Sequence, residues 1–131
     1  MPVVEETIAR AVVRRGDHVL LVQEIAAGYW FFPGGHVEAG ESPHDAVVRE
    51  LREELDVGAT VDDVLGEVPN EWVHDGVEHR EVNHVFAVRV DAADPASQEP
   101  HLAAGWHRLD ELESIDVRPR VLAELVAGLR R

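Results

Sequence analysis

Residues 35–57, GHVEAGESPHDAVVRELREELDV, decide the fold of this chain. The middle of the segment carries the start signals of a helix. Ser42 is a good N-cap, and Pro43 suits the first helical position because its missing N–H is not needed there. Asp45 falls in the first turn, where the helix dipole favours negative charge. We therefore predict a helix that begins after Ser42 and ends near Leu55.

This helix is predicted to have an apolar stripe and a separate acidic face. With about 100° between successive residues, the stripe that should face a sheet comprises Val47, Val48, Leu51 and Leu55. Glu50, Glu53 and Glu54 lie together on another side, around the small Ala46. Glu50 and Glu54 are four residues apart, a like-charge pair that costs roughly a few tenths of a kcal/mol. A hard divalent cation such as Mg²⁺ would offset that cost, because it prefers oxygen ligands and links carboxylates to phosphates.

An acidic helix face is often only solvated, and Arg49 and Arg52 could neutralise it through ion pairs. The residues around the helix favour a metal site instead. A Gly-Gly turn precedes the helix, and Glu41 comes just before the N-cap. Arg49 adjoins the acidic cluster, where a guanidinium can fix a carboxylate by bidentate hydrogen bonding.

The segment resembles the signature of the Nudix hydrolase family, G-x5-E-x7-R-E-U-x-E-E-x-G-U, in which U is a bulky aliphatic residue. The matching positions, all in register, are Gly35, Glu41, Arg49, Glu50, Leu51, Glu53, Glu54 and Val57. Asp56 stands where the family has glycine. Because aspartate tolerates the left-handed conformation better than most residues, we interpret this difference as a local change in how the helix ends.

The resemblance implies an α/β (α+β) fold, the Nudix α/β/α sandwich, in which a central mixed β-sheet lies between this helix and a C-terminal helix. Periodicity alone indicates only an α/β or α+β protein. Residues 1–131 are expected to form a single Nudix domain with the signature at 35–57. Two hairpins are expected, one of strands 7–14 and 18–23 joined by a turn at 15–17, and one of strands 61–72 and 78–90 joined by a turn at 74–76. The other expected elements are a polar loop at 91–100, a strand at 105–109, and a helix over 118–131 with Val121, Leu122, Leu125 and Leu129 on its apolar face.

The resemblance also implies roles for the matched residues in metal-dependent hydrolysis of a nucleoside diphosphate linked to another group. Glu50 and Glu54 are the expected main metal ligands, and Glu53 is a further ligand or the general base. The backbone carbonyl of Gly35 completes the coordination. The remaining expected participants are Arg49, which orients a glutamate, Glu41, which braces the loop or joins a second metal site, and Glu99, a second candidate for base or ligand. The expected cofactor is Mg²⁺, for which Mn²⁺ substitutes.

Substrate selection is expected to involve residues outside the signature. Phe31 and its neighbours Tyr29 and Trp30 lead into the site, and Trp72 and Trp106 fall in predicted strands. Each ring could stack on a nucleobase or pack in the core. Arg80 is a candidate for binding a phosphate or ribose, since an acidic pocket needs a fixed positive group. A surface ion pair between Arg80 and Glu78 or Glu81 is the alternative.

The composition limits the class of protein further. The chain has 131 residues, 26 acidic against 12 basic side chains, a net charge of −14 and no cysteine. These figures suit one domain, exclude disulfides and thiolate zinc sites, and argue against binding to long nucleic acids. The sequence shows no membrane-length apolar run and no leader pattern at its start, so we expect a cytoplasmic protein.

We therefore expect a Mg²⁺-dependent pyrophosphohydrolase acting on a small nucleotide, such as a (deoxy)nucleoside triphosphate or a nucleotide sugar. One alternative is a nucleotide-binding sensor with the same fold and no activity. Another is a hydrolase of dinucleoside polyphosphates or RNA 5′ ends. A homodimer is compatible with the resemblance.

Overall fold

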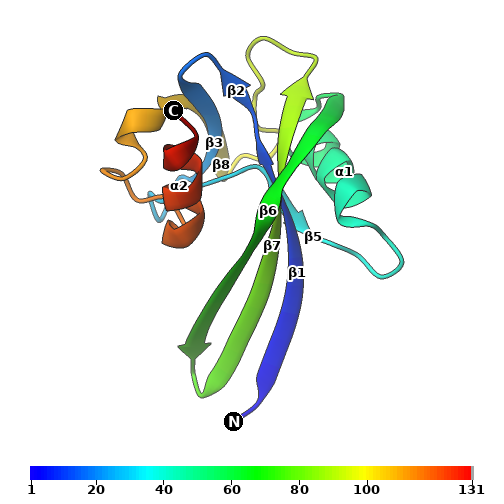
Figure 1. The fold of residues 1–131 in the computed structure, drawn as a ribbon, viewed down its shortest axis with the longest axis vertical. Helices are drawn as coiled ribbons and strands as arrows, with labels where there is room; N and C mark the ends of the chain where they lie inside the picture. Colours follow the sequence, from blue (N-terminus) through cyan, green and yellow to red (C-terminus); the bar gives the residue numbers. More distant parts are fainter. Residues whose placement is uncertain (131) are drawn as a thin grey trace.

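The computed structural model describes residues 1–130 of the chain, which form a mixed sheet, a second smaller sheet and two α-helices (Figure 1). In chain order the elements are β1 (Val3–Val12), β2 (Arg14–Arg15), β3 (His18–Glu24), β4 (Trp30–Phe31), β5 (Gly34–His36), α1 (Pro43–Leu55), β6 (Ala59–His74), β7 (Val77–Val90), β8 (Leu102–Arg108), the 3₁₀ turn η1 (Leu109–Glu111), α2 (Arg120–Ala127) and the 3₁₀ turn η2 (Gly128–Arg130). Neither helix is long and apolar enough to cross a membrane.

The larger sheet is mixed and has the strand order β5-β1-β7-β6. β1 pairs in parallel with β7 and antiparallel with β5, while β6 and β7 form a long antiparallel hairpin. The smaller sheet contains β2, β3 and β4, with β8 antiparallel to the other side of β3. The mixed sheet agrees with the expected fold class.

The two hairpins predicted from the sequence have different outcomes. The β6–β7 hairpin is confirmed, and its turn residues Asp75 and Gly76 both have positive φ, 49° and 73°, as hairpin turns of type I′ require. The first hairpin is correct only at its turn, because just Arg14 and Arg15 pair with β3. β1 instead joins the larger sheet. Local alternation predicts a strand but does not name its partner, which is why the pairing was wrong.

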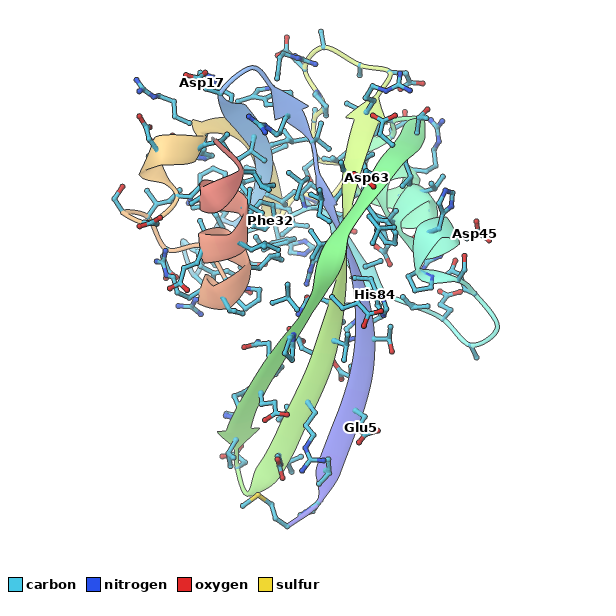
Figure 2. The ribbon with its side chains drawn as sticks, viewed as in Figure 1. Glu5, Asp17, Phe32, Asp45, Asp63 and His84 are labelled. Atoms are coloured by element: carbon cyan, nitrogen blue, oxygen red, sulfur yellow. The ribbon has the colours of Figure 1, made fainter. Side chains whose placement is uncertain are left out.

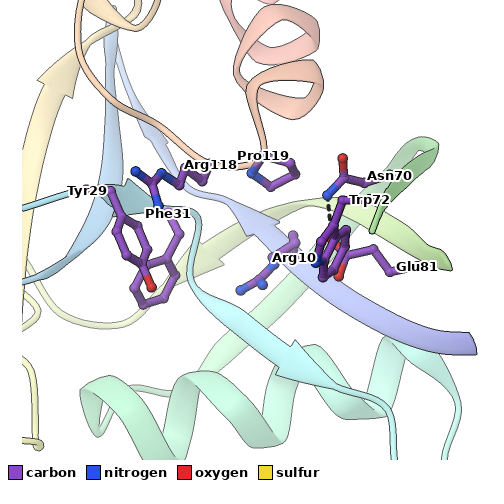
Figure 3. Close-up of a pocket in the computed structure, with 8 residues that line it drawn as sticks. All are labelled: Arg10, Tyr29, Phe31, Asn70, Trp72, Glu81, Arg118 and Pro119. Atoms are coloured by element: carbon purple, nitrogen blue, oxygen red, sulfur yellow. Dashed lines mark hydrogen bonds between the residues drawn. The ribbon is translucent and has the colours of Figure 1, made fainter. Parts of the chain in front are cut away.

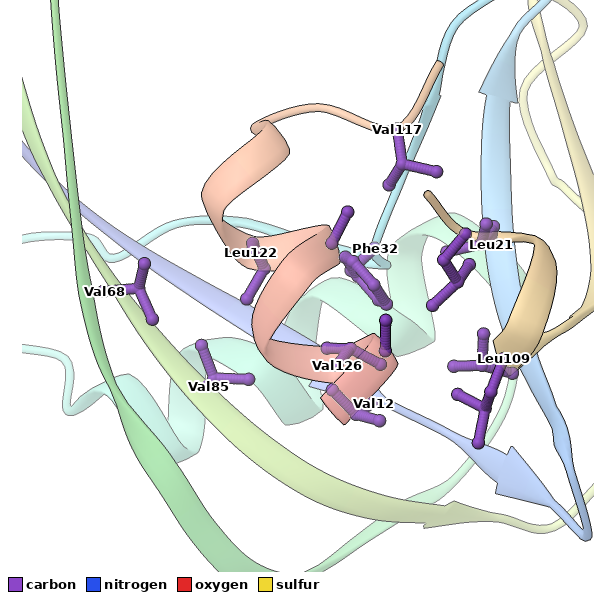
Figure 4. Packing of buried hydrophobic residues seen from close by; sticks show 13 residues of the cluster. Val12, Leu21, Phe32, Val68, Val85, Leu109, Val117, Leu122 and Val126 are labelled. Atoms are coloured by element: carbon purple, nitrogen blue, oxygen red, sulfur yellow. The ribbon is translucent and has the colours of Figure 1, made fainter. Parts of the chain in front are cut away.

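Each side of the larger sheet buries one helix, and this arrangement is the expected sandwich. The α1 side contains Ala46, Val47 and Leu51 of the helix packed with Ala11 and Phe86 of the strands. Because consecutive strand residues point to opposite faces, the next positions along β1 and β7 belong to the other core. That second core, on the α2 side, includes Val12, Phe32, Val85, Leu122 and Val126 (Figure 4). Phe32 lies in the interior, whereas Asp45 lies at the periphery (Figure 2).

Helix α1 has the predicted limits and caps. The Oγ atom of Ser42 accepts a hydrogen bond from the backbone N–H of Asp45 at 3.1 Å. Asp56 ends the helix with φ 52° and ψ 45°, and its N–H donates to the carbonyl of Arg52. The helical wheel was wrong about Ala46 and Glu54, because both belong to the buried side and are 0% and 8% exposed.

Helix α2 is shorter than predicted and presents a different face to the core. Regular α-helix runs from Arg120 to Ala127, and Arg131 lies outside the described residues. Val121, predicted to face inward, is 41% exposed, while Leu122, Ala123 and Val126 are fully buried. The buried face of the helix includes Ala123 and Ala127, and the sequence pattern undervalued these alanine positions.

Replacing Asp56 by glycine tests whether the helix end carries backbone strain. Glycine reaches positive φ without strain, so we expect Asp56→Gly to raise the free energy of unfolding by up to about 1 kcal/mol in urea titrations. The control Asp45→Gly changes a residue in the first helical turn and should lower stability by about 1 kcal/mol. A destabilised D56G protein would show that the aspartate side chain stabilises this end.

Candidate active site

Two glycines allow β5 to pass between β1 and α1 and so create the site. Gly34 has φ 140°, and a Cβ atom there would overlap the carbonyl oxygen of Ala9 on β1. A Cβ atom at Gly35 would lie 2.7 Å from the carboxyl carbon of Glu50. The backbone of Gly35 therefore rests directly against a carboxylate of the helix.

Arg49 organises the carboxylates on the exposed side of the cluster. Its Nε donates to Oε2 of Glu41 at 2.8 Å and its Nη2 donates to Oε1 at 3.0 Å, a bidentate pair. Its Nη1 donates to Glu50 at 3.0 Å and to Glu53 at 3.2 Å, and its Nη2 also reaches the carbonyl of His36. These bonds lower the pKa of Glu41 and raise that of Arg49. One guanidinium thus fixes three glutamates.

Glu54 lies on the inner side of the cluster in a different environment. Its Oε1 atom is buried and has no hydrogen-bond partner among the described residues. Burial, followed by repulsion from Glu50, raises the pKa of Glu54 to about 8. The charge of Arg10 and the N–H of Gly34 oppose this shift, and Glu99 adds to it. The carboxylate is therefore held where its charge is poorly compensated by the protein.

The loop that precedes β8 brings Glu99 toward this cluster. The N–H of Gln98 donates to the carbonyl of Glu54 at 2.8 Å, which fixes the loop on the end of α1. Ser97 stabilises the next turn, since its Oγ donates to the carbonyl of Glu99 and accepts from the N–H of Glu99. The structure therefore places Glu99 near Glu54, although the two are far apart in sequence.

The structure contains a cavity of about 580 Å³ (Figure 3). Its lining residues are Arg10, Tyr29, Phe31, Asn70, Trp72, Glu81, Arg118 and Pro119. Arg10 connects it to the acidic cluster, because the charges of Glu54 and Glu50 both act on that guanidinium. Arg10 therefore lies both at the cavity and within electrostatic range of the carboxylates of α1.

Comparison with known proteins agrees with this arrangement. A family model, the NUDIX domain, matches residues 5–127. The chain belongs to the Nudix hydrolase family. It is 35% identical over 118 residues to a putative 8-oxo-dGTP diphosphatase 2 of Mycobacterium tuberculosis, covering 86% of this chain and 79% of that protein. A shorter match to a CTP pyrophosphohydrolase of Escherichia coli is 48% identical over 58 residues, or 41% of this chain and 43% of that one.

The fold of a solved structure is also similar. The solution structure of the E. coli ORF135 protein superposes with a TM-score of 0.74 and 29% identity, covering 96% of this chain and 91% of that one. Nudix hydrolases cleave pyrophosphate bonds in substrates that contain a nucleoside diphosphate, and they generally use divalent metal ions. The chain is accordingly a hydrolase that acts on pyrophosphate bonds.

The Nudix residues present here fit a divalent cation. Glu54 offers a buried oxygen without a partner, and Glu50 lies close enough to raise its pKa. Bound cations invert the local electrostatics of such a site, because they favour ionised carboxylates. Within residues 1–130, no three acidic or histidine side chains already have the spacing of a metal centre, and Arg49 engages an oxygen of Glu50 and one of Glu53.

The residues proposed from the sequence for substrate binding divide into two groups. Phe31 and Trp72 line the cavity. Arg80 does not, because it lies on the exposed part of β7 with its Nε donating to Glu78 at 3.0 Å. Of the other candidate rings, Trp30 packs against the α2-side core, and Trp106 lies under the guanidinium of Arg15 at 4.4 Å.

Sequence reasoning missed Arg10, Asn70, Glu81 and Arg118 as cavity residues. One feature of the sequence could have identified Arg10: it is the charged residue within the otherwise apolar run Ile8-Ala9-Arg10-Ala11-Val12. No sequence feature could have identified the other three residues, because their position at the cavity depends on strand pairing. Asn70 of β6, for example, lies opposite Glu81 of β7 and donates to it at 3.3 Å.

Glu54→Gln tests the burial of this charge in metal-free protein. An acid with a raised pKa in the folded state binds more protons when folded, so the metal-free protein should lose stability as pH rises from about 4.5 to about 8. E54Q lacks that loss and should be more stable than the unaltered chain above pH 8, by at least about 1 kcal/mol. Denaturant titrations in EDTA measure the difference.

Glu53→Gln is the matched control for this prediction, because Glu53 is on the same helix and its side chain is 58% exposed. E53Q should follow the pH profile of the unaltered chain. An E54Q profile parallel to that of the unaltered chain between these pH values would contradict the assignment of Glu54 as a buried, uncompensated carboxylate.

Proposed function

We propose that this chain is a Mg²⁺-dependent pyrophosphohydrolase of small nucleotides, with (deoxy)nucleoside triphosphates as the first substrate class to test. The observation that carries the proposal is that buried Glu54 and partly buried Glu50 both act electrostatically on Arg10, which lines an aromatic cavity. An acidic site binds a polyanionic diphosphate only with cations between them. A cavity beside that site provides room for the nucleoside.

Glu50 and Glu54 are the proposed ligands of Mg²⁺, with the carbonyl of Gly35 as a further oxygen donor. Mg²⁺ supplies charge neutralisation of the phosphate oxygens and a bound water of lowered pKa. Arg49 holds Glu50 and Glu53 in position through its hydrogen bonds. Glu41 holds Arg49 in turn, through the bidentate pair.

Two residues are proposed for the general base, Glu53 and Glu99. Glu53 is exposed and receives only one hydrogen bond from Arg49, so one of its oxygens remains free to accept a proton. Glu99 lies on the loop that is fixed to the end of α1. A comparison of E53Q and E99Q separates them, since loss of a positioned base costs about 10²- to 10⁴-fold in rate.

The cavity is the proposed site of the nucleobase. Tyr29 and Phe31 come from the segment before Gly34, and Trp72 comes from the β6–β7 hairpin, so rings from separate parts of the chain line the same space. The Trp72 ring is held in place by a parallel stack on His79, with centroids 4.9 Å apart. The names of two relatives, an 8-oxo-dGTP diphosphatase and a CTP pyrophosphohydrolase, favour triphosphates over nucleotide sugars.

A hydrolysis panel tests the proposed activity. We expect Mg²⁺- or Mn²⁺-dependent turnover of at least one nucleoside triphosphate, and product analysis identifies which phosphorus is attacked. Glu54→Gln should lower kcat by roughly 10²-fold or more. Glu38→Gln is the control, because its side chain is 69% exposed and lies only at the margin of the Arg49 network. The absence of turnover across the panel, with tight nucleotide binding, would favour a sensor.

Trp72→Ala tests the nucleobase site separately from the chemistry. We expect KM for the preferred nucleotide to rise about tenfold with little change in kcat, because a stacked base loses roughly 1–3 kcal/mol. Trp106→Ala is the control, since Trp106 lies outside the cavity. Equal effects of the two substitutions would argue against stacking on Trp72.

A further inference from the structure

Arg10 is a cationic side chain whose hydrogen-bonding capacity is largely unused by the protein. Its Nη1 donates to the carbonyl of Phe32 at 3.1 Å. Its Nε is buried without a partner, and its accessible Nη2 has no acceptor among residues 1–130. Arg10 also has no ion-pair partner in that part of the chain. The guanidinium also lies over the Phe31 ring, 5.7 Å from its centroid, a contact that uses none of its N–H groups. Because a guanidinium can only donate, the group that this position lacks is a hydrogen-bond acceptor.

The other arginines near the site are already engaged. Arg118 lines the same cavity, but it forms a bidentate ion pair with Asp116, at 3.1 and 3.0 Å, and stacks on Tyr29 at 4.5 Å. Arg49 uses its three nitrogens on Glu41, Glu50, Glu53 and His36. Among the described residues that line the cavity, Arg10 is therefore the cation available to a ligand.

The charges around Arg10 explain why it suits an anion only when metal is bound. Glu54 and Glu50 act on it from α1, and Glu81 acts on it from β7. In metal-free protein the negative charges of these carboxylates compensate the positive charge of the guanidinium without direct contact. Cations held by Glu50 and Glu54 would remove much of that compensation, and an anion placed between the cations and Arg10 would restore it.

The position of Arg10 identifies which anion this is. Figure 3 shows Arg10 between the side of the cavity that holds Phe31 and the side that holds Trp72, with α1 beyond it. A nucleotide with its base among the aromatic rings and its diphosphate at the carboxylates must pass this guanidinium. Resting on the function proposed above, we propose that Arg10 binds a phosphate group of the substrate and so sets the distance between base and diphosphate.

The test compares ligands that differ only in a phosphate. Ligand-observed NMR titrations in EDTA and in Mg²⁺ measure the affinities of cytidine and guanosine and of their 5′-monophosphates. We expect the phosphate to increase affinity about tenfold in Mg²⁺, a typical gain for a charge-assisted hydrogen bond, and to contribute less in EDTA. Arg10→Gln should abolish this gain and leave nucleoside affinity unchanged, while Arg10→Lys should restore part of it.

Arg118→Gln is the matched control, because Arg118 lines the same cavity but is paired with Asp116. It should keep the phosphate gain. In hydrolysis assays R10Q should raise KM about tenfold with a smaller fall in kcat. A phosphate gain that persists in R10Q, or that is lost in R118Q instead, overturns the proposal.

A measurement on the unaltered chain keeps the test decisive if R10Q does not fold. The guanidinium N–H signals of Arg10 should shift on addition of a 5′-monophosphate with Mg²⁺ and not on addition of the nucleoside. No shift with either ligand overturns the proposal. Failure of this inference can be distinguished from failure of the proposed function. Hydrolysis that does not depend on Arg10 rejects this inference alone. A phosphate gain that depends on Arg10, without hydrolysis of any nucleotide, rejects the proposed enzyme activity and retains the phosphate contact.

Discussion

A side chain at Gly34 would overlap the backbone of β1, and one at Gly35 would press into the carboxylate of Glu50. The close passage of β5 between β1 and α1 is thus the constraint on which the fold and the site both depend. It holds α1 against the sheet at the turn of the helix that carries Glu50 and Glu54. Without this approach, the same glutamates would be ordinary charges on a solvated helix.

This close packing has an electrostatic consequence for the two sides of the cluster. Arg49 stabilises the outer carboxylates, which remain partly solvated, through four hydrogen bonds. Glu54 receives no comparable support, and burial raises its pKa to about 8. A buried charge is tolerated in a protein when it is paired or binds a metal. The asymmetry between the two sides supports cation binding on the inner side of α1, adjacent to the cavity.

The acidity of the chain also takes on a local meaning. A net charge of −14 argues against contact with long nucleic acids, yet the cavity contains two arginines, Arg10 and Arg118. Arg118 is paired with Asp116, so among the described residues that line the cavity Arg10 is the cation left for a nucleotide. Arg80, the arginine chosen from the sequence for this task, instead pairs with Glu78 on the surface. The alternative interpretation, a surface ion pair with an acidic residue nearby in the sequence, was therefore the correct one for Arg80.

The sequence by itself determined helix α1, its caps, the left-handed end at Asp56 and the β6–β7 turn, because each depends on residues within a few positions of one another. It also determined the family, since the signature is a local spacing of glutamates and glycine. Only the tertiary structure decided the partner of β1, the burial of Glu54 and the meeting of Arg10, Phe31 and Trp72 around one cavity. These features depend on strand pairing between distant segments, such as Arg10 of β1 with Val85 of β7, and no local pattern encodes which strands will pair.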